Sequence, residues 1–155
     1  DWIAGYVSPL LTYTEAGRTR REELTGALEK ALPNVQGVRA VYDATKGASL
    51  RSSTSDVERW IGASLPDDPP GDAYVLSEPG WFDALAIAGG TNHGTPWPYD
   101  RQVPVLMWGT AIERRTSEDV QNVLRVATSL SALLGVPAPE GAPNDPLPGV
   151  MRLPD

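Results

Sequence analysis

The residue best suited to chemistry is His93, the only histidine in the 155-residue sequence. It stands in a stretch interrupted by glycine and proline, TNHGTPWPYDRQ at 91–102. An imidazole nitrogen can bind zinc or act as a general base. A zinc site takes about three protein ligands when catalytic and about four when structural, so His93 would need carboxylates such as Asp83 or Asp100 beside it. No known loop motif combines these residues at this spacing, and the spacing alone favours a structural role for His93.

Other chemical signals in the sequence are weaker. It contains no cysteine, which excludes disulfides and thiolate chemistry. The pair Gly89-Gly90 is too short a motif to predict a phosphate-binding loop. Three arginines stand at an expected helix start next to two glutamates, and a solvated surface explains them better than an anion site. These arginines are Arg18, Arg20 and Arg21.

The aromatic residues divide into two groups. Trp97 and Tyr99 lie beside His93, where they could line the rim of a pocket or pack against the neighbouring prolines. Three other tryptophans fall on expected apolar faces or strand ends, and we predict that they belong to the core. They are Trp60, Trp81 and Trp108.

The composition, with 41% hydrophobic and 21% charged residues, is typical of a globular protein. The net charge of −7 repels nucleic-acid phosphates and anionic lipids. No apolar run approaches the roughly 18 residues that a membrane span needs. We therefore expect no binding to a nucleic-acid backbone and no membrane partner. The chain begins with neither Met nor the basic segment of a signal peptide, so we expect it to be part of a longer polypeptide.

Hydrophobic periodicity predicts strands that alternate with helices. Expected strands are 6–14, 38–42, 73–76 and 103–108, the last buried on both faces, while 83–90 is either a strand or a buried turn. Expected helices follow a capping box at Thr19 and Glu22 as far as Pro33, open at Ser55, and span 117–134 before Gly135. The apolar face of this last helix would consist of Val120, Val123, Leu124, Ala127, Leu130 and Leu134.

This order of elements predicts an α/β protein, or an α+β fold for the isolated fragment. We expect a small α+β unit resembling βαβαβ at 1–82. A sheet and helix segment that carries the His93 loop would follow at 83–137, and an irregular proline-rich tail at 138–155. A strand buried on both faces needs neighbours on each side, which this chain hardly supplies.

Four stretches resemble segments of the alkaline phosphatase superfamily. The most specific is GGTNHGTPWPYDRQVPVLMWG at 89–109, and the others are GDAYVLSEPGWF at 71–82, SEDVQNVLRVATSLSALLGVPAPEG at 117–141 and LEKALPNVQGVRAVYD at 28–43. The likeness is greatest to alkaline phosphatases of the type I phosphodiesterase/nucleotide pyrophosphatase branch, and it covers most of the chain. One departure is Val126-Ala127-Thr128, where the family usually has Ala-Pro-Thr, and this change predicts a straighter helix.

The resemblance implies that His93 is the last protein ligand of a centre with two Zn²⁺ ions. The family's other ligands, an Asp-x-x-x-His pair, an Asp-His pair, an early Asp and a Thr or Ser nucleophile, would lie upstream. With one histidine, neither pair exists in this sequence, so no complete metal site and no catalytic residue are expected in this chain. Asp100 is the candidate acceptor for the free ring nitrogen of His93, and Thr91 and Thr95 are candidates for further hydrogen bonds.

By this resemblance, the chain is the C-terminal part of a zinc-dependent phosphatase or phosphodiesterase and is inactive alone. Its partners would be the N-terminal part of the same polypeptide and a phosphate-ester substrate, and its location would be periplasmic or secreted. One alternative is a non-catalytic α+β binding module that keeps only the scaffold. Another is a stand-alone hydrolase with His93 as general base, but no Ser or Asp is arranged around His93 in a recognisable pattern.

Overall fold

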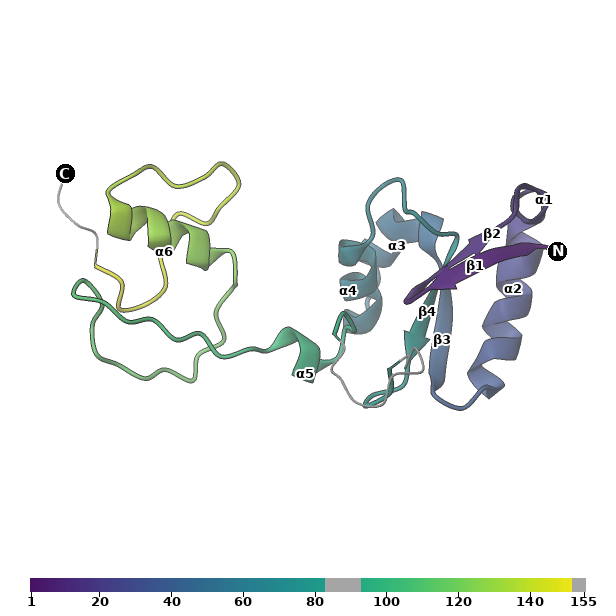
Figure 1. Ribbon diagram of the computed structural model, residues 1–155, viewed down its shortest axis with the longest axis horizontal. Coiled ribbons are helices and arrows are strands. Elements are labelled where there is room, and N and C mark those ends of the chain that lie inside the picture. Colours follow the sequence, from purple (N-terminus) through teal and green to yellow (C-terminus); the bar gives the residue numbers. More distant parts are fainter. Residues whose placement is uncertain (83–92, 152–155) are drawn as a thin grey trace. The chain divides into compact units, whose positions relative to one another are not determined.

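A computed structural model provides the structure of the protein and describes residues 1–82 and 93–151 (Figure 1). The chain forms two compact units, Asp1–Val103 and Pro104–Asp155. The expected boundaries after residues 82 and 137 stay predictions, and the expected strand or turn at 83–90 lies outside the described residues. Within the described ranges, no helix is long and apolar enough to cross a membrane.

A four-stranded sheet forms the centre of the first unit. Its strands are β1 (Ile3–Val7), β2 (Leu10–Tyr13), β3 (Val38–Asp43) and β4 (Ala73–Ser77), in the spatial order β1-β2-β4-β3. Every neighbouring pair is antiparallel. β2 and β3 therefore run parallel to each other with β4 between them. The mixture of helices with an antiparallel sheet agrees with the predicted α/β class in its α+β form.

Helices cover both faces of this sheet (Figure 1). Alternation along each strand sends one set of side chains to each face. Leu11, Val41 and Val75 pack with Leu24 of α2 (Arg21–Ala31) on one face. The opposite face packs against α4 (Asp56–Ser64), with Tyr74, Leu76 and Ile61 in its core. The remaining short helices of the first unit are α1 (Glu15–Arg18), α3 (Gly47–Arg51) and α5 (Pro98–Arg101), with 3₁₀ turns η1 (Leu32–Asn34) and η2 (Ala44–Lys46).

Side-chain capping explains where α1 and α4 begin. Ser55 caps α4 as predicted, because its hydroxyl accepts the amide of Glu58 at 3.5 Å. The capping box at Thr19 is wrong. Thr14 instead caps α1 by accepting the amide of Gly17, while the Thr19 hydroxyl donates to the backbone of the preceding turn. The expected strand 6–14 is a hairpin of β1 and β2, since a turn at Ser8-Pro9 interrupts it.

A glycine allows α3 and α4 to approach closely. A Cβ atom at Gly62 would lie 2.5 Å from the Arg51 amide nitrogen and 2.8 Å from the Gly47 carbonyl oxygen. Arg51 strengthens this contact, because its guanidinium donates to the carbonyl oxygens of Gly62 and Leu65 at 3.0 and 3.1 Å. Any larger residue at position 62 would push the two helices apart.

Asp72 joins five elements of the first unit at the start of β4. Its carboxylate is 2% exposed and accepts the Tyr13 amide at 2.7 Å. Arg18 and Arg21 reach the same carboxylate from α1 and α2, at 3.2 and 2.6 Å. The Asp72 backbone donates to the carbonyl oxygen of Leu11 and accepts the amide of Ala44. One residue therefore connects β2, β4, the η2 turn that follows β3, the end of α1 and the start of α2.

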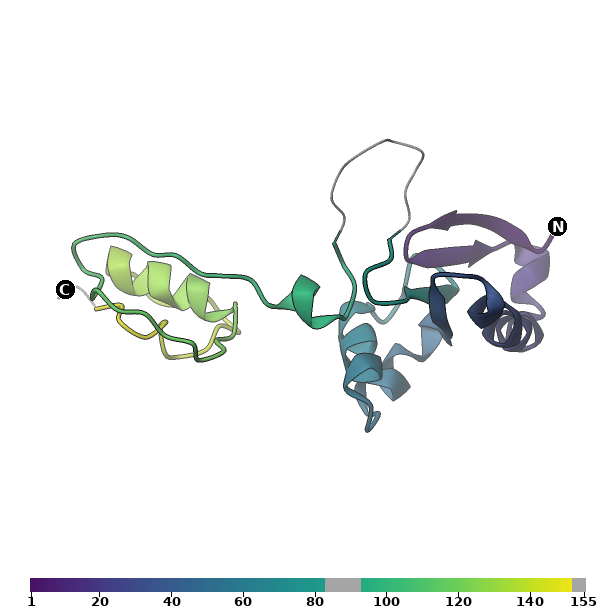
Figure 2. The ribbon, with the colours of Figure 1, turned by 90° about the horizontal axis from the view of Figure 1, so that it is seen from below.

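The second unit has one helix, α6 (Arg125–Leu134), among its described residues, and irregular chain runs along it (Figure 2). The hydroxyl of Ser129 accepts the Leu147 amide at 2.8 Å, and the Thr128 hydroxyl donates to the Pro143 carbonyl at 2.6 Å. Ile112 and Val150 form an isolated antiparallel bridge. Backbone and hydroxyl hydrogen bonds, rather than a broad apolar core, hold these segments together.

Two predictions fail in the second half of the chain. Residues 103–108 form no strand, and Leu106 and Trp108 are 95% and 98% exposed. The expected helix 117–134 begins only at Arg125, and its apolar face turns outward with Leu130 and Leu134 exposed. A buried strand needs a sheet edge beside it, and no strand among the described residues pairs with this stretch. Gly135 ends the helix as predicted, with φ of 65°.

Substitution Asp72→Asn tests the role assigned to this carboxylate. The change removes a buried negative charge and leaves the Arg18 and Arg21 guanidiniums facing an amide. We expect the free energy of unfolding to fall by about 2–4 kcal/mol, measured by urea denaturation. Asp67→Asn is the matched control, because Asp67 pairs with Arg51 but is 95% exposed, and its effect should stay within about 0.5 kcal/mol. Equal effects of the two substitutions would contradict the role of Asp72.

Candidate functional site

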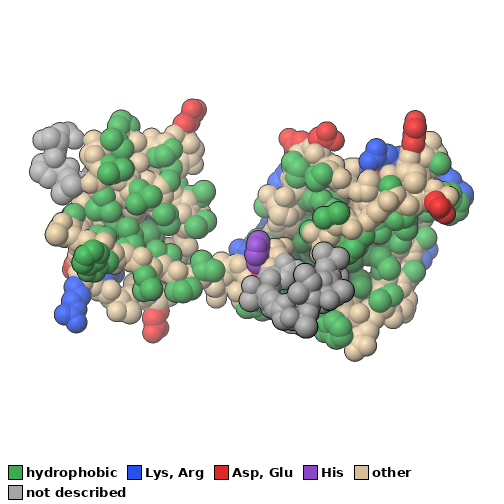
Figure 3. Space-filling model, viewed as in Figure 1, with side chains coloured by type: hydrophobic (Ala, Val, Ile, Leu, Met, Phe, Trp, Pro, Cys, Tyr) green, Lys and Arg blue, Asp and Glu red, His purple; other side chains and the backbone are tan. Residues whose placement is uncertain are grey.

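The loop that carries His93 lies at the surface of the first unit, and its imidazole is exposed (Figure 3). Gly94 follows with φ of 105°, a conformation that favours glycine and turns the chain sharply. The one-turn helix α5 then begins at Pro98, whose fixed φ suits the first helical position. These features present the imidazole on a short loop that α5 closes.

Thr95 and Asp100 hold the loop together from within. Asp100 Oδ2 accepts the Thr95 amide at 2.9 Å and the Thr95 hydroxyl at 2.5 Å. The hydroxyl hydrogen bond, followed by the amide hydrogen bond, lowers the pKa of the Asp100 carboxyl below its ordinary value. Partial burial opposes this shift, and the nearby charge of His93 adds a smaller lowering effect. The carboxylate is therefore ionised at neutral pH and close enough to His93 to interact with it electrostatically.

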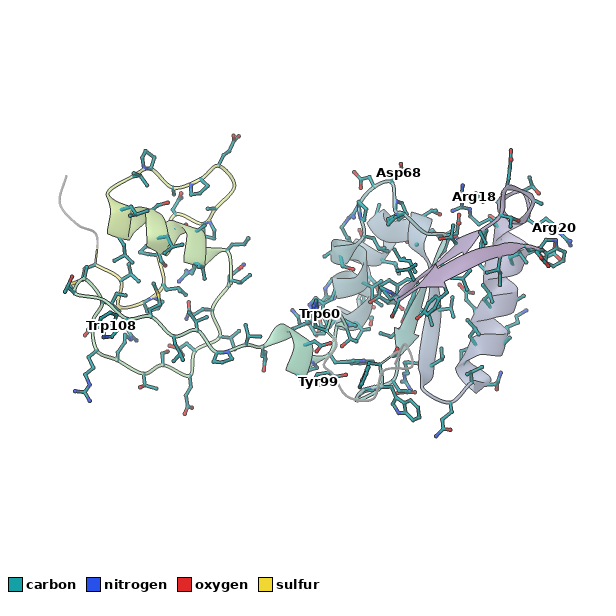
Figure 4. The ribbon with its side chains drawn as sticks, viewed as in Figure 1. Arg18, Arg20, Trp60, Asp68, Tyr99 and Trp108 are labelled. Carbon is teal, nitrogen blue, oxygen red and sulfur yellow. The ribbon has the colours of Figure 1, made fainter. Side chains whose placement is uncertain are left out.

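Three side chains fasten the loop to the rest of the first unit. The indole nitrogen of Trp97 donates to the Ser77 carbonyl at 3.0 Å. The Tyr99 hydroxyl accepts the Gly80 amide at 2.9 Å. The guanidinium of Arg101 lies over the Trp60 ring, 3.5 Å from its centroid. Figure 4 shows Tyr99 on α5 and Trp60 on α4. Trp97 and Tyr99 thus make polar contacts to the end of β4 and the turn beyond it.

Among the predicted site residues, the structure brings Thr95 and Asp100 together and puts His93 within electrostatic reach of Asp100. Thr91 and Asp83 lie outside the described residues. The assignment of His93 as a metal ligand, with Asp100 and Thr95 supporting it, stays a prediction. The contact between Arg101 and Trp60 was not expected, because 41 positions separate them and no local spacing connects α4 with α5.

Two expectations about arginines and tryptophans need correction. The solvated surface expected for the arginines is only part of their role: Arg18 is 52% exposed, yet both it and the less exposed Arg21 pair with the buried carboxylate of Asp72. Trp81 and Trp108 are not core residues, since Trp81 is 45% exposed and Trp108 almost fully so. Trp81 packs instead against Gly37, where a Cβ atom would lie 2.5 Å from its ring.

Arg20 lies on the surface as predicted, and Trp60 is partly buried where a core residue was predicted. Arg20 forms an exposed ion pair with Glu23 and lies over the Trp2 ring at 4.5 Å. Trp60 is half-buried and belongs to a helix that packs on the sheet. Arg20 is therefore the surface arginine that the sequence predicted.

The donor set around His93 fits one ligand of a shared metal site. Across residues 1–82 and 93–151, no three His, Cys, Asp or Glu side chains gather closely enough to hold a metal ion. An exposed imidazole beside a carboxylate can supply one nitrogen ligand with an electrostatic partner. Further ligands would have to come from other parts of a protein.

Substitution Thr95→Val tests the interaction that orders this loop. Loss of the hydroxyl donor should raise the pKa of Asp100 toward its ordinary value, measured by NMR titration of the carboxyl carbon. Because the folded-state pKa is depressed, the stabilisation of the loop is complete above the ordinary pKa and is lost as the pH falls through the depressed value. Thr95→Ser, which keeps the hydroxyl, should retain the low pKa. An unchanged Asp100 pKa in Thr95→Val would rule out the Thr95 hydroxyl as its main cause.

Comparison with known proteins gives matches over much of the chain. No family model and no solved structure matches it. It is 26% identical over 133 residues to a calcium-transporting ATPase of Myroides odoratus, covering 86% of this chain and 24% of that protein. It is 28% identical over 135 residues to alkaline phosphatase PhoK of Sphingomonas sp, covering 82% of this chain and 24% of that protein. It is 31% identical over 72 residues to alkaline phosphatase PhoV of Synechococcus elongatus, covering 46% of this chain and 13% of that protein.

The chain therefore spans between 13% and 24% of the length of these three relatives. Other alkaline phosphatases match at 30% and 27% identity. The agreement among several alkaline phosphatases shows that this chain is related in sequence to that group of phosphoric-ester hydrolases.

Proposed function

We propose that this chain is the C-terminal part of a zinc-dependent phosphoric-ester hydrolase and contributes one metal ligand, His93. The observation that carries the proposal is the exposed imidazole on a short, internally hydrogen-bonded loop in a chain related to alkaline phosphatases. Asp100, which holds this loop through Thr95, also places a carboxylate charge near the imidazole. The remaining ligands and the nucleophile would belong to other parts of a longer polypeptide.

In this proposal, His93 binds the metal through one ring nitrogen. The other ring nitrogen donates a hydrogen bond, and Asp100 is the described carboxylate whose charge favours that arrangement. Thr95 holds Asp100 in place through two hydrogen bonds to the same oxygen atom. A pair of Zn²⁺ ions, when bound, would stabilise the attacking and leaving oxygens during phosphoryl transfer.

Substrate class and location follow from the resemblance to the type I phosphodiesterase/nucleotide pyrophosphatase branch. We propose a phosphomonoester or phosphodiester substrate and a periplasmic or secreted enzyme whose N-terminal part completes the site. The alkaline-phosphatase-like layered arrangement of the whole enzyme belongs to the same proposal. The net charge of −7 argues against a nucleic-acid backbone as a binding partner.

The test is a comparison of variants in the longer polypeptide that contains this chain. Hydrolysis of p-nitrophenyl phosphate and zinc content by mass spectrometry are measured for each. We expect His93→Ala to lower kcat/KM by about 100-fold or more and to reduce the zinc content, because a direct ligand is lost. Asp100→Asn should lower kcat/KM by about 10–100-fold, as changes to the partner of a ligating histidine do.

Asp67→Asn is the control, since this exposed carboxylate pairs with Arg51 at 2.8 Å, away from the His93 loop contacts described above. It should leave both measurements unchanged. If His93→Ala kept wild-type turnover and zinc content, the proposal would fail, and a non-catalytic α+β binding module would be the better interpretation.

A further inference from the structure

The one-turn helix α5 sends three successive side chains to three different partners. Successive residues in a helix point about 100° apart, so a single turn can reach in three directions. Tyr99 accepts the Gly80 amide, Asp100 accepts both donors of Thr95, and Arg101 lies over Trp60. The turn itself is closed by the Gln102 amide, which donates to the Pro98 carbonyl at 2.8 Å.

Arg101 makes the contact that connects α5 to α4, a helix that packs on the sheet. Its guanidinium carbon is 3.5 Å from the Trp60 ring centroid, well inside the range of about 6 Å in which a cation is attracted to an aromatic face. The planar guanidinium can also stack on the indole, which a lysine ammonium cannot do.

Trp60 is a firm platform for this contact because α4 cannot shift easily. The adjacent Ile61 is 1% exposed in the core beneath the sheet, and Gly62 is in tight contact with α3. Val57, one turn earlier, packs against the same core. Movement of α4 would therefore disturb the core cluster on this face of the sheet.

We propose that Arg101 and Trp60 form a positioning pair that sets where His93 is presented. The route is short: Arg101 fixes α5 on α4, the adjoining Asp100 binds Thr95, and Thr95 lies two residues from His93. As a statement about a metal ligand, this inference rests on the proposed function. As a statement about the order of the loop, it can be tested without metal.

The test is amide hydrogen exchange of the 155-residue chain, followed by NMR without added metal. Two amides report on the loop, because Thr95 donates to Asp100 and Gly80 donates to Tyr99. In Arg101→Ala we expect both to exchange about three to thirty times faster, as the loss of one cation–π contact predicts. The Val75 amide, which donates from β4 to the Pro9 carbonyl in the turn between β1 and β2, should not change.

Two further variants separate positioning from general destabilisation. Arg20→Ala removes the comparable stacking over Trp2, at 4.5 Å, and should leave the Thr95 and Gly80 amides unchanged. Trp60→Phe keeps an aromatic face and should retain most of the protection, whereas Trp60→Leu should lose it. Unchanged exchange of the Thr95 amide in Arg101→Ala would overturn the inference. Equal acceleration of Val75 would overturn it too, since the effect would then be global unfolding.

The failure of this inference can be told apart from failure of the proposed function. If the loop amides respond while His93→Ala leaves zinc content and turnover of the longer polypeptide unchanged, the positioning pair stands and the metal role of His93 is wrong. If the loop amides do not respond while His93→Ala removes zinc and activity, the metal role stands and the positioning pair is wrong.

Discussion

The buried carboxylate of Asp72 is the constraint on which the first unit depends. A charged group that is 2% exposed must be matched by donors, and here the donors come from β2, α1 and α2. Its backbone also bonds to Leu11 and Ala44. Because these partners belong to segments far apart in the sequence, the carboxylate can be satisfied only when the helices and strands are assembled correctly.

Strand β4 connects the buried Asp72 carboxylate to the His93 loop. Asp72 immediately precedes β4, which is buried on both faces, and Ser77 ends it. The Ser77 carbonyl accepts the Trp97 indole, and Gly80, just beyond, donates to Tyr99. Ion pairs of Asp72 therefore hold the start of β4 in place. The end of β4 and the helix α4 bind the His93 loop. A rigid strand with a loop bound at its end is a common way to present a functional residue.

Local patterns predicted the parts of the fold that local interactions decide. The helix opened by Ser55, the strands β3 and β4, and the end of α6 at Gly135 all follow from capping, alternation and glycine geometry. The pairing of Arg18 with Asp72 was missed because 54 positions separate the two residues. The predictions for residues 103–108 and for the apolar face of α6 were wrong for another reason. Their apolar patterns predict burial against a neighbouring segment, and no described segment covers them. In the His93 loop, the sequence predicted roles for Thr95 and Asp100 but not the contact of Arg101 with Trp60.

The most direct test of the central claim is to sequence the DNA upstream of the codon for Asp1. We expect a reading frame that continues upstream for hundreds of codons and encodes a Thr or Ser nucleophile, an Asp-x-x-x-His pair and an Asp-His pair. Together with His93, these residues would complete a two-zinc site. A frame that opens within a few codons of Asp1 would contradict the proposed two-zinc hydrolase, and His93 would then be an ordinary loop residue of a binding module.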